Sequence, residues 1–201
     1  MYSLLKGTWA LFFGVGRIML ANGLQGSLIG VRASLEGYSA LSAGIILTGY
    51  YAGFLSGALL IPNRVKSVGH VRMFAALASI ASISILLHSI HVSFIGWFLM
   101  RFISGMCFVG MYTVAESWIN DLSENNNRGK ALSVYMMVSM GGSAIGQLFL
   151  NIASPETASL FMLVSILISI SLVPILIVVS NQPDFSAVSY THLRAHETLP
   201  Y

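Results

Sequence analysis

The stretch RFISGMCFVGMYTVAESW, from Arg101 to Trp118, places two opposite charges inside an otherwise apolar segment. Fifteen residues (116 − 101) separate Arg101 from Glu116, which on an α-helix is about 22 Å of rise and about 60° of rotation. Both charges therefore share one helix face with Gly105, Phe108 and Tyr112. Because isolated charges are costly in lipid, this face should point at protein or at a water-filled cavity. The stretch predicts a polytopic membrane protein with a pathway through it.

The composition supports a membrane protein. The chain has 201 residues, of which 56% are hydrophobic and 8% are charged, with a mean hydropathy of +0.80. Soluble domains average about 25% charged residues. The net charge of +3 comes from residues scattered through short loops, which excludes a nucleic-acid-binding patch and favours anchoring at a membrane surface. The one cysteine, Cys107, excludes a disulfide framework and is expected to be inert packing.

Six apolar segments are long enough to cross the hydrocarbon core, which takes roughly 20 residues per helix. An all-α membrane protein is therefore the predicted fold class. Between the second and third segments, residues 62–72 contain three basic residues, a proline and a glycine and predict a polar turn. His88 and His91 fall near the next turn, where they are expected to be extracytoplasmic turn residues. The predicted spans are 8–31, 38–61, 72–90, 94–118, 131–152 and 158–180.

Glycines recur at close-packing spacing in three of these spans. Four-residue spacing of small residues lets two helices approach closely, so packing is the expected role. In the first span a small-and-polar stripe includes Arg17 and Gln25. Arg17 either points into the bundle or extends to the nearby interface. The predicted packing glycines are Gly49, Gly53, Gly57, Gly105, Gly142 and Gly146.

The orientation is predicted from lysine and arginine placement. Loops on the side of the N-terminus hold six basic residues, whereas loops on the other side hold only Arg32. This distribution predicts that both termini lie in the cytoplasm, in a multi-pass protein of the plasma (inner) membrane. The six are Lys6, Arg64, Lys66, Arg72, Arg128 and Lys130.

The composition changes abruptly after about Asp184. Residues 1–184 are predicted to form the six-span transmembrane unit, and 185–201 a disordered or non-native-looking tail. His192, His196 and Glu197 have a spacing that suits metal ligands, but a tail without a scaffold cannot hold the ion in place. We therefore predict no metal site and no cofactor.

At this point the pattern resembles the N-terminal half of a major facilitator superfamily transporter. Arg101 to Gly105 is similar to the family's span-four motif, in which an arginine and a phenylalanine precede a glycine. Arg128-Gly129 resembles the Arg-Gly pair that enters span five. The loop after span two departs from the family, because Asn63-Arg64 stands where Asp-Arg is usual and Gly69 comes three residues late.

The resemblance implies two six-span halves around a central cavity, each half built from two inverted three-helix repeats. It implies a secondary active transporter that moves a small solute by alternating access, with a proton as a candidate coupling ion. The expected partners are the bilayer, a small-molecule substrate and the missing C-terminal six-helix half. This half alone is expected not to transport.

Several residues are candidates for that activity. Arg101 can bind an anionic substrate or favour the ionised form of a nearby carboxylate. It can also form a purely structural pair that holds helices together. Glu116, near its span's cytoplasmic end, is a candidate for a gating contact with Arg64 or Arg128, for proton coupling, or for a solvated interface position. Gly69 joins the gating candidates. Weaker candidates for the substrate or coupling site are Arg17, Gln25 and Tyr112.

Other classes fit less well, and an enzyme is not expected. Residues 141–145 miss the Gly-x-Ser-x-Gly pattern of a serine hydrolase. The sequence at 128–131 lacks the remaining residues of a phosphate loop, and the predicted loops are too short to meet a separate ATPase. A non-transporting membrane scaffold or receptor is the alternative that stays open.

Overall fold

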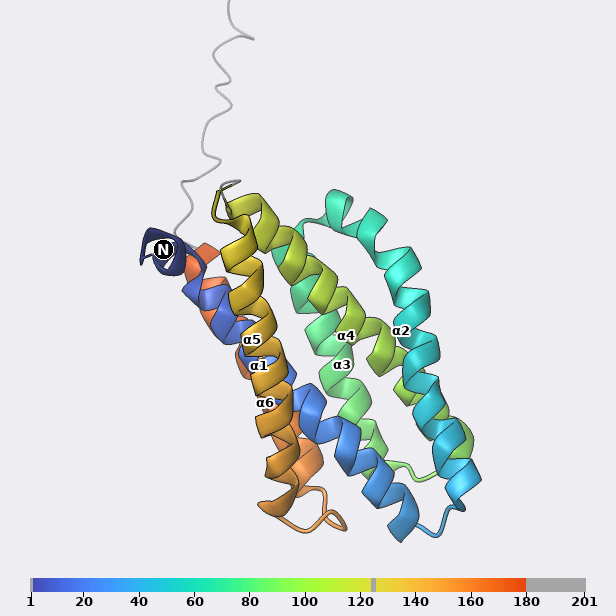
Figure 1. The fold of residues 1–201 in the computed structure, drawn as a ribbon. Coiled ribbons are helices and arrows are strands. Elements are labelled where there is room, and N and C mark those ends of the chain that lie inside the picture. The colour runs from blue at the N-terminus through green and yellow to red at the C-terminus, as the bar shows by residue number, and fades with distance from the viewer. Residues whose placement is uncertain (1, 124–125, 180–201) are drawn as a thin grey trace, which may run out of the picture.

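The computed structural model describes residues 2–123 and 126–179, where the regular structure is helical (Figure 1). Six long α-helices follow one another along the described chain, with a short 3₁₀ turn after the fifth. This confirms the predicted all-α fold class. The bounds are α1 (Tyr2–Leu35), α2 (Ala40–Val68), α3 (His70–Ile90), α4 (Phe94–Leu122), α5 (Arg128–Leu148), η1 (Phe149–Asn151) and α6 (Ser159–Val179).

Helices α2 to α6 are each long and apolar enough to cross a membrane. Helix α1 is the longest, with 34 residues, and it carries the polar residues Arg17, Asn22 and Gln25 within its length. It nevertheless runs the length of the bundle beside them (Figure 1). Five of the six helices therefore qualify as membrane spans by length and composition, and α1 packs along them.

The second turn is shorter than the sequence predicts. Helix α2 continues through Pro62 to Val68, and only Gly69 separates it from α3. Gly69 has φ +89°, a left-handed conformation that favours glycine. A proline inside a membrane helix is tolerated where neighbouring groups satisfy the freed backbone. The predicted turn at residues 62–72 is therefore too long: the chain turns at Gly69, inside that range, and α2 bends near its C-terminal end (Figure 1).

The third turn lies where the predicted spans place it, because α3 ends at Ile90 and α4 begins at Phe94. Ser93 ends the turn by accepting a hydrogen bond from the Gly96 amide at 3.1 Å. His88 is 1% exposed, its Nδ1 lies 2.8 Å from the Ser84 carbonyl oxygen, and its ring faces Trp97. The expectation that His88 is a turn residue is therefore wrong, whereas His91 does lie in the turn.

The connections alternate between the two ends of the bundle. The N-terminus, the α2–α3 turn, the loop after α4 and the end of α6 lie at one end (Figure 1). The three other connections lie at the opposite end, where Arg32 pairs with Glu36 and donates hydrogen bonds to the carbonyl oxygens of Pro155 and Glu156. We call these the N-terminal end and the opposite end.

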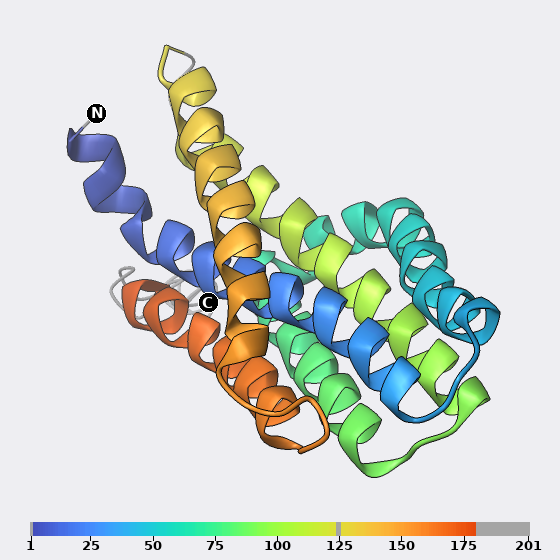
Figure 2. The same cartoon turned by 60° about the horizontal axis from the view of Figure 1, so that its bottom comes forward.

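The packing of the helices has an internal twofold pattern. Helix α2 packs along α4 and α1 along α5, while α1 also packs on α6, α3 on α4, and α3 on α6 (Figures 1 and 2). Exchanging α1 with α4, α2 with α5 and α3 with α6 reproduces the same set of neighbours. This is the arrangement expected of two inverted three-helix repeats.

The glycine contacts show the same relation at the residue level. A Cβ on Gly53 would lie 1.8 Å from the Phe102 carbonyl oxygen, and one on Gly146 would lie 2.2 Å from that of Leu20. Both glycines therefore let backbones touch. The matching contacts of the two helix pairs are Gly49 on Phe98, Gly53 on Phe102 and Gly105 on Tyr50 for α2 and α4, and Gly142 on Gly16, Gly146 on Leu20 and Gly23 on Ser143 for α1 and α5.

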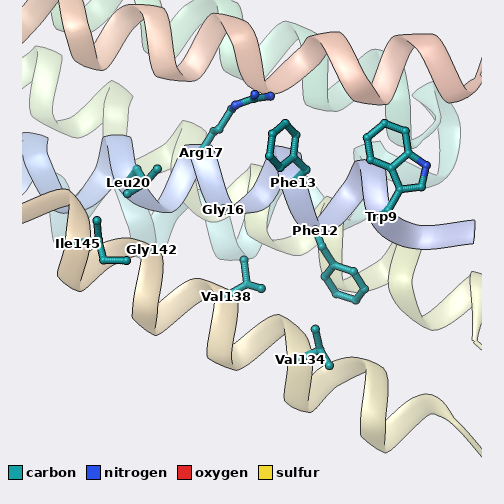
Figure 3. Close-up of a pocket in the computed structure, with 10 residues that line it drawn as sticks. All are labelled: Trp9, Phe12, Phe13, Gly16, Arg17, Leu20, Val134, Val138, Gly142 and Ile145. Carbon is teal, nitrogen blue, oxygen red and sulfur yellow. The ribbon is translucent and has the colours of Figure 1, made fainter. Parts of the chain in front are cut away.

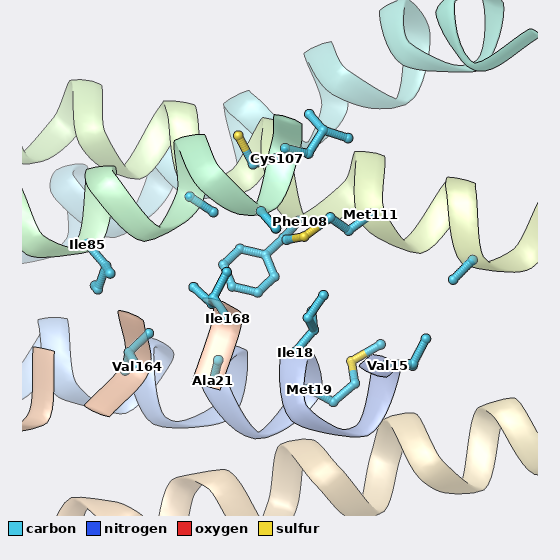
Figure 4. Close-up of a cluster of buried hydrophobic side chains, with 14 of the residues drawn as sticks. Val15, Ile18, Met19, Ala21, Ile85, Cys107, Phe108, Met111, Val164 and Ile168 are labelled. Atoms are coloured by element: carbon cyan, nitrogen blue, oxygen red, sulfur yellow. The ribbon is translucent and has the colours of Figure 1, made fainter. Parts of the chain in front are cut away.

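The apolar core lies where α1, α3, α4 and α6 meet (Figure 4). Phe108 and Met111 of α4 are buried there against residues from the other three helices. This core leaves one face of the unit to be formed by α1, α2, α4 and α5. The labelled members from the other helices are Val15, Ile18, Met19 and Ala21 of α1, Ile85 of α3, and Val164 and Ile168 of α6.

Candidate functional site

A polar cleft of about 320 Å³ opens between α1, α2, α4 and α5. These are the first two helices of each three-helix repeat. The cleft therefore lies at the interface between the two repeats. It lies nearer the opposite end than the N-terminal end, because its lining residues in α2 lie near that helix's start and those in α5 near that helix's finish. The lining residues are Asn22, Gly23, Gly26, Ser27, Leu47, Tyr51, Arg101, Ser143 and Gln147.

Arg101 supplies the charge of this cleft. Its side chain is 4% exposed, and its Nε and Nη1 atoms have no hydrogen-bond partner among the described residues. The described lining contains no carboxylate. A buried guanidinium without an acceptor is unfavourable unless water or a bound anion supplies one. The cleft is therefore suited to an anionic or strongly polar group.

Tyr50 holds the guanidinium in place. The Cζ atom of Arg101 lies 4.5 Å from the centre of the Tyr50 ring, a cation–π contact. The Tyr50 hydroxyl donates a hydrogen bond of 3.0 Å to Oδ1 of Asn22 in α1. Gly105, one turn after Arg101, lets α4 approach the Tyr50 backbone. The close packing of α2 and α4 thus sets the position of Arg101.

The other residues predicted on the Arg101 face lie as follows. Phe108 and Tyr112 pack their rings against aromatic side chains of α2. Glu116 is exposed, about four turns from Arg101 toward the N-terminal end, and lies near the Tyr135 hydroxyl of α5. The face of α4 that carries these residues therefore packs against α2 from Arg101 to Tyr112. At Glu116 it is exposed.

The gating candidates lie at the N-terminal end without an ion pair between them. Arg128 donates a hydrogen bond of 2.7 Å from Nε to Oδ1 of Asn120. Arg64 is exposed, and the ion pairs within the described residues involve only Arg32 with Glu36 and His70 with Asp121. A contact of Glu116 with Arg64 or Arg128 therefore stays a prediction for another conformation.

The two candidates on α1 are not in the polar cleft. Gln25 is fully buried beside it, and neither of its amide atoms has a hydrogen-bond partner in the described part of the chain. Arg17 lines a separate, apolar cleft, where its Cζ atom lies 3.7 Å from the centre of the Phe13 ring (Figure 3).

Sequence reasoning missed Asn22, Tyr50, Tyr51 and Gln147 as site residues. The usable signal was position: Tyr50 and Tyr51 follow Gly49 directly, and Asn22 precedes Gly23, so both sets lie beside a close helix contact. Ser143 contacts Gly23 of α1 and also lines the polar cleft.

A six-helix membrane unit with inverted repeats and a polar cleft on its repeat interface defines one half of a secondary-transporter fold. A profile of the Major Facilitator Superfamily matches residues 10–191. The chain belongs to this superfamily.

Relatives named as uncharacterized MFS-type transporters are among the matches. The "Uncharacterized MFS-type transporter YcaD" of Escherichia coli strain K12 / DH10B is 28% identical over 166 residues, which cover 83% of this chain and 44% of the relative. The proteins of the same name in strains O157:H7 EC4115 and SMS-3-5 match to the same extent. The chain thus matches less than half the length of these relatives.

Proposed function

We propose that this chain is the N-terminal half of a secondary active transporter that moves a small anionic or polar solute by alternating access. The observation that carries the proposal is Arg101, a buried and unpaired cation at a polar cleft without carboxylates among the described lining residues. In this role Arg101 binds the solute, and Asn22, Ser27, Ser143 and Gln147 supply neutral hydrogen-bonding groups around it.

The second half of the transporter is proposed to cover the face that bears this cleft. Substrate sites of such transporters lie near the membrane midplane between the two repeated units. Large apolar side chains such as Tyr51, Leu55 and Met137 are exposed on α2 and α5, which flank the cleft. The match to under half of the relatives' length fits this arrangement.

Coupling and gating are proposed for the N-terminal end. Glu116 lies in the part of α4 toward the N-terminal end and interacts with Tyr135, so in this proposal it exchanges partners between Tyr135 and Arg64 or Arg128 as the halves rock. Gly69 supplies the tight turn between α2 and α3 at that end. A proton is the proposed coupling ion, and we propose that this end faces the cytoplasm of an inner-membrane protein, which the basic residues near it support.

The test is uptake or efflux of radiolabelled organic anions by the full-length transporter in membrane vesicles. We expect Arg101→Ala to abolish transport while expression and membrane insertion stay normal, and Arg101→Lys to retain the charge but lose much of the rate, because an ammonium cannot reproduce the planar fork. Unchanged transport in Arg101→Ala would rule out this role.

A further inference from the structure

The apolar cleft that contains Arg17 lies on the outside of the α1–α5 contact (Figure 3). On α5 it is lined by Val134, Val138 and Ile145, whereas the polar cleft is lined by Ser143 and Gln147. The glycines that touch α1 lie between these two sets on the helix. The two clefts are therefore on opposite sides of the helix contact, and a solute in one does not reach the other directly.

The walls of the outer cleft are apolar and open sideways. Trp9 and Phe13 are about half exposed at its edge, at 49% and 51%. The cleft has a volume of about 550 Å³, within the roughly 300–1,000 Å³ of small-molecule sites. A single apolar chain can enter such a cleft from the membrane without crossing water.

Arg17 lies deep in the membrane. Its neighbour Gly16 faces Val138, the middle residue of α5, so Arg17 is close to the centre of the span. The guanidinium reaches back over Phe13, one helical turn or about 6 Å toward the N-terminal end. Half of the hydrocarbon core is about 15 Å thick. The guanidinium therefore ends below the headgroup region.

Arg17 also lacks an anionic partner in the protein. Among residues whose side chains the structure describes, the ion pairs involve Arg32 and His70, not Arg17. Instead, its guanidinium makes a cation–π contact with the Phe13 ring. An intramembrane cation of this type marks a functional site by default, and charge complementarity calls for an anion attached to an apolar body.

We infer that the outer cleft binds the anion of a long-chain fatty acid from the bilayer. The acyl chain lies along Phe13, Gly16 and Val138, and the carboxylate accepts hydrogen bonds from the Arg17 guanidinium, which extends on the Phe13 side of α1 (Figure 3). A fatty acid fits better than a phospholipid because its small headgroup can sink below the interface to reach Arg17.

The test uses quenching of Trp9 fluorescence by brominated palmitate, with the protein in phosphatidylcholine nanodiscs. Of the other two tryptophans, Trp97 is fully buried and Trp118 half-buried, and neither lines the cleft, so Trp9→Phe establishes how much of the signal comes from the cleft. We expect saturable quenching that palmitate displaces and its uncharged methyl ester does not. Arg17→Gln should raise the half-saturating concentration about tenfold or more, the equivalent of a charged hydrogen bond, while Arg17→Lys should raise it less.

A steric pair of variants separates binding in the cleft from a folding defect. Val138→Phe fills the cleft and should weaken quenching, whereas Met137→Phe, next to it on α5 but 74% exposed and outside the lining, should not. The inference is overturned if Arg17→Gln matches the wild type, if the methyl ester competes equally, or if brominated phosphatidylcholine gives the same quenching that palmitate fails to displace.

Discussion

Arg101 and Tyr50 form a pair at the polar cleft, because the guanidinium of Arg101 lies over the Tyr50 ring. The Tyr50 ring makes a cation–π contact with the guanidinium, and Asn22 holds the ring through the Tyr50 hydroxyl. This leaves two nitrogens of Arg101 unpaired among the described residues. At this scale the protein fixes a cation without neutralising it, which is what a site for an incoming anion requires.

Removing the ring should loosen that cation. We expect Tyr50→Leu to raise the KM for the transported solute about 2- to 30-fold, the range of a cation–π contact of about 0.5–2 kcal/mol. Tyr50→Phe keeps the ring and loses only the hydrogen bond to Asn22, so its effect should be smaller. KM values from initial rates of transport check the order, and a larger effect for Tyr50→Phe would contradict this role of the ring.

The sequence did not predict which cleft each polar side chain of α1 faces. The spacing of Arg101 and Glu116 predicted a shared face, and Arg101 does line a polar cleft. The stripe containing Arg17 and Gln25 did not reveal that α1 borders two clefts, with Gln25 buried between its neighbours. Which side of a helix faces which neighbour is set by tertiary contacts such as Gly23 on Ser143, and these are not local in sequence.

At the scale of the helices, paired glycines fix how close α2 and α4 come. The four-residue register of Gly49, Gly53 and Gly57 predicted a close contact, and the partner positions Phe98, Phe102 and Met106 repeat with the same spacing. The sequence did not identify α4 as the partner, since any helix with a complementary surface would satisfy the pattern.

A pair of substitutions on α2 tests this contact. A Cβ on Gly53 would overlap the Phe102 carbonyl oxygen, whereas one on Gly44 would meet nothing within 4 Å. We expect Gly53→Ala to lower the free energy of unfolding by about 1–3 kcal/mol, as overpacking does. Gly44→Ala should leave it unchanged or raise it by up to about 1 kcal/mol. Thermal unfolding in detergent checks both, and equal melting temperatures would contradict the close packing.

Helix ends were less predictable than helix existence. All six spans were expected at about the observed places, but α2 passes through Pro62 and α3 extends past His88. Proline and histidine are signals for a turn in water, where freed backbone groups bond to solvent. Inside a bundle, neighbouring helices can satisfy or bury the same groups, so the helix continues.

At the scale of the whole molecule, the bundle has two chemically different ends. Basic residues such as Arg64, Arg72 and Arg128 lie near the ends of α2, α3 and α5 at the N-terminal end, and Arg32 lies in the last turn of α1 at the opposite end. The alternation of connections is a property of the fold, while the orientation in the membrane is a prediction from charge.

Labelling of single cysteines tests that orientation. In a Cys107→Ala background, Ser67→Cys reports on the N-terminal end and Glu156→Cys on the opposite end, and both positions are exposed. We expect a membrane-impermeant maleimide added to intact cells to modify Glu156→Cys alone, and Ser67→Cys only after the cells are opened. The reverse pattern would mean that the basic end faces outward.

Thiol labelling measures whether water reaches the cleft beside Arg101, and so tests whether Arg101 borders a solute route. Ser143→Cys places a thiol in the lining, and Ser79→Cys places one at an exposed position of α3 outside it. The thiolate is the reactive form of cysteine and does not form in lipid. We therefore predict that a charged methanethiosulfonate modifies Ser143→Cys much faster than Ser79→Cys. Saturating substrate should slow that reaction. Equal, negligible rates at both positions would show that Arg101 borders no aqueous route, and would contradict the account.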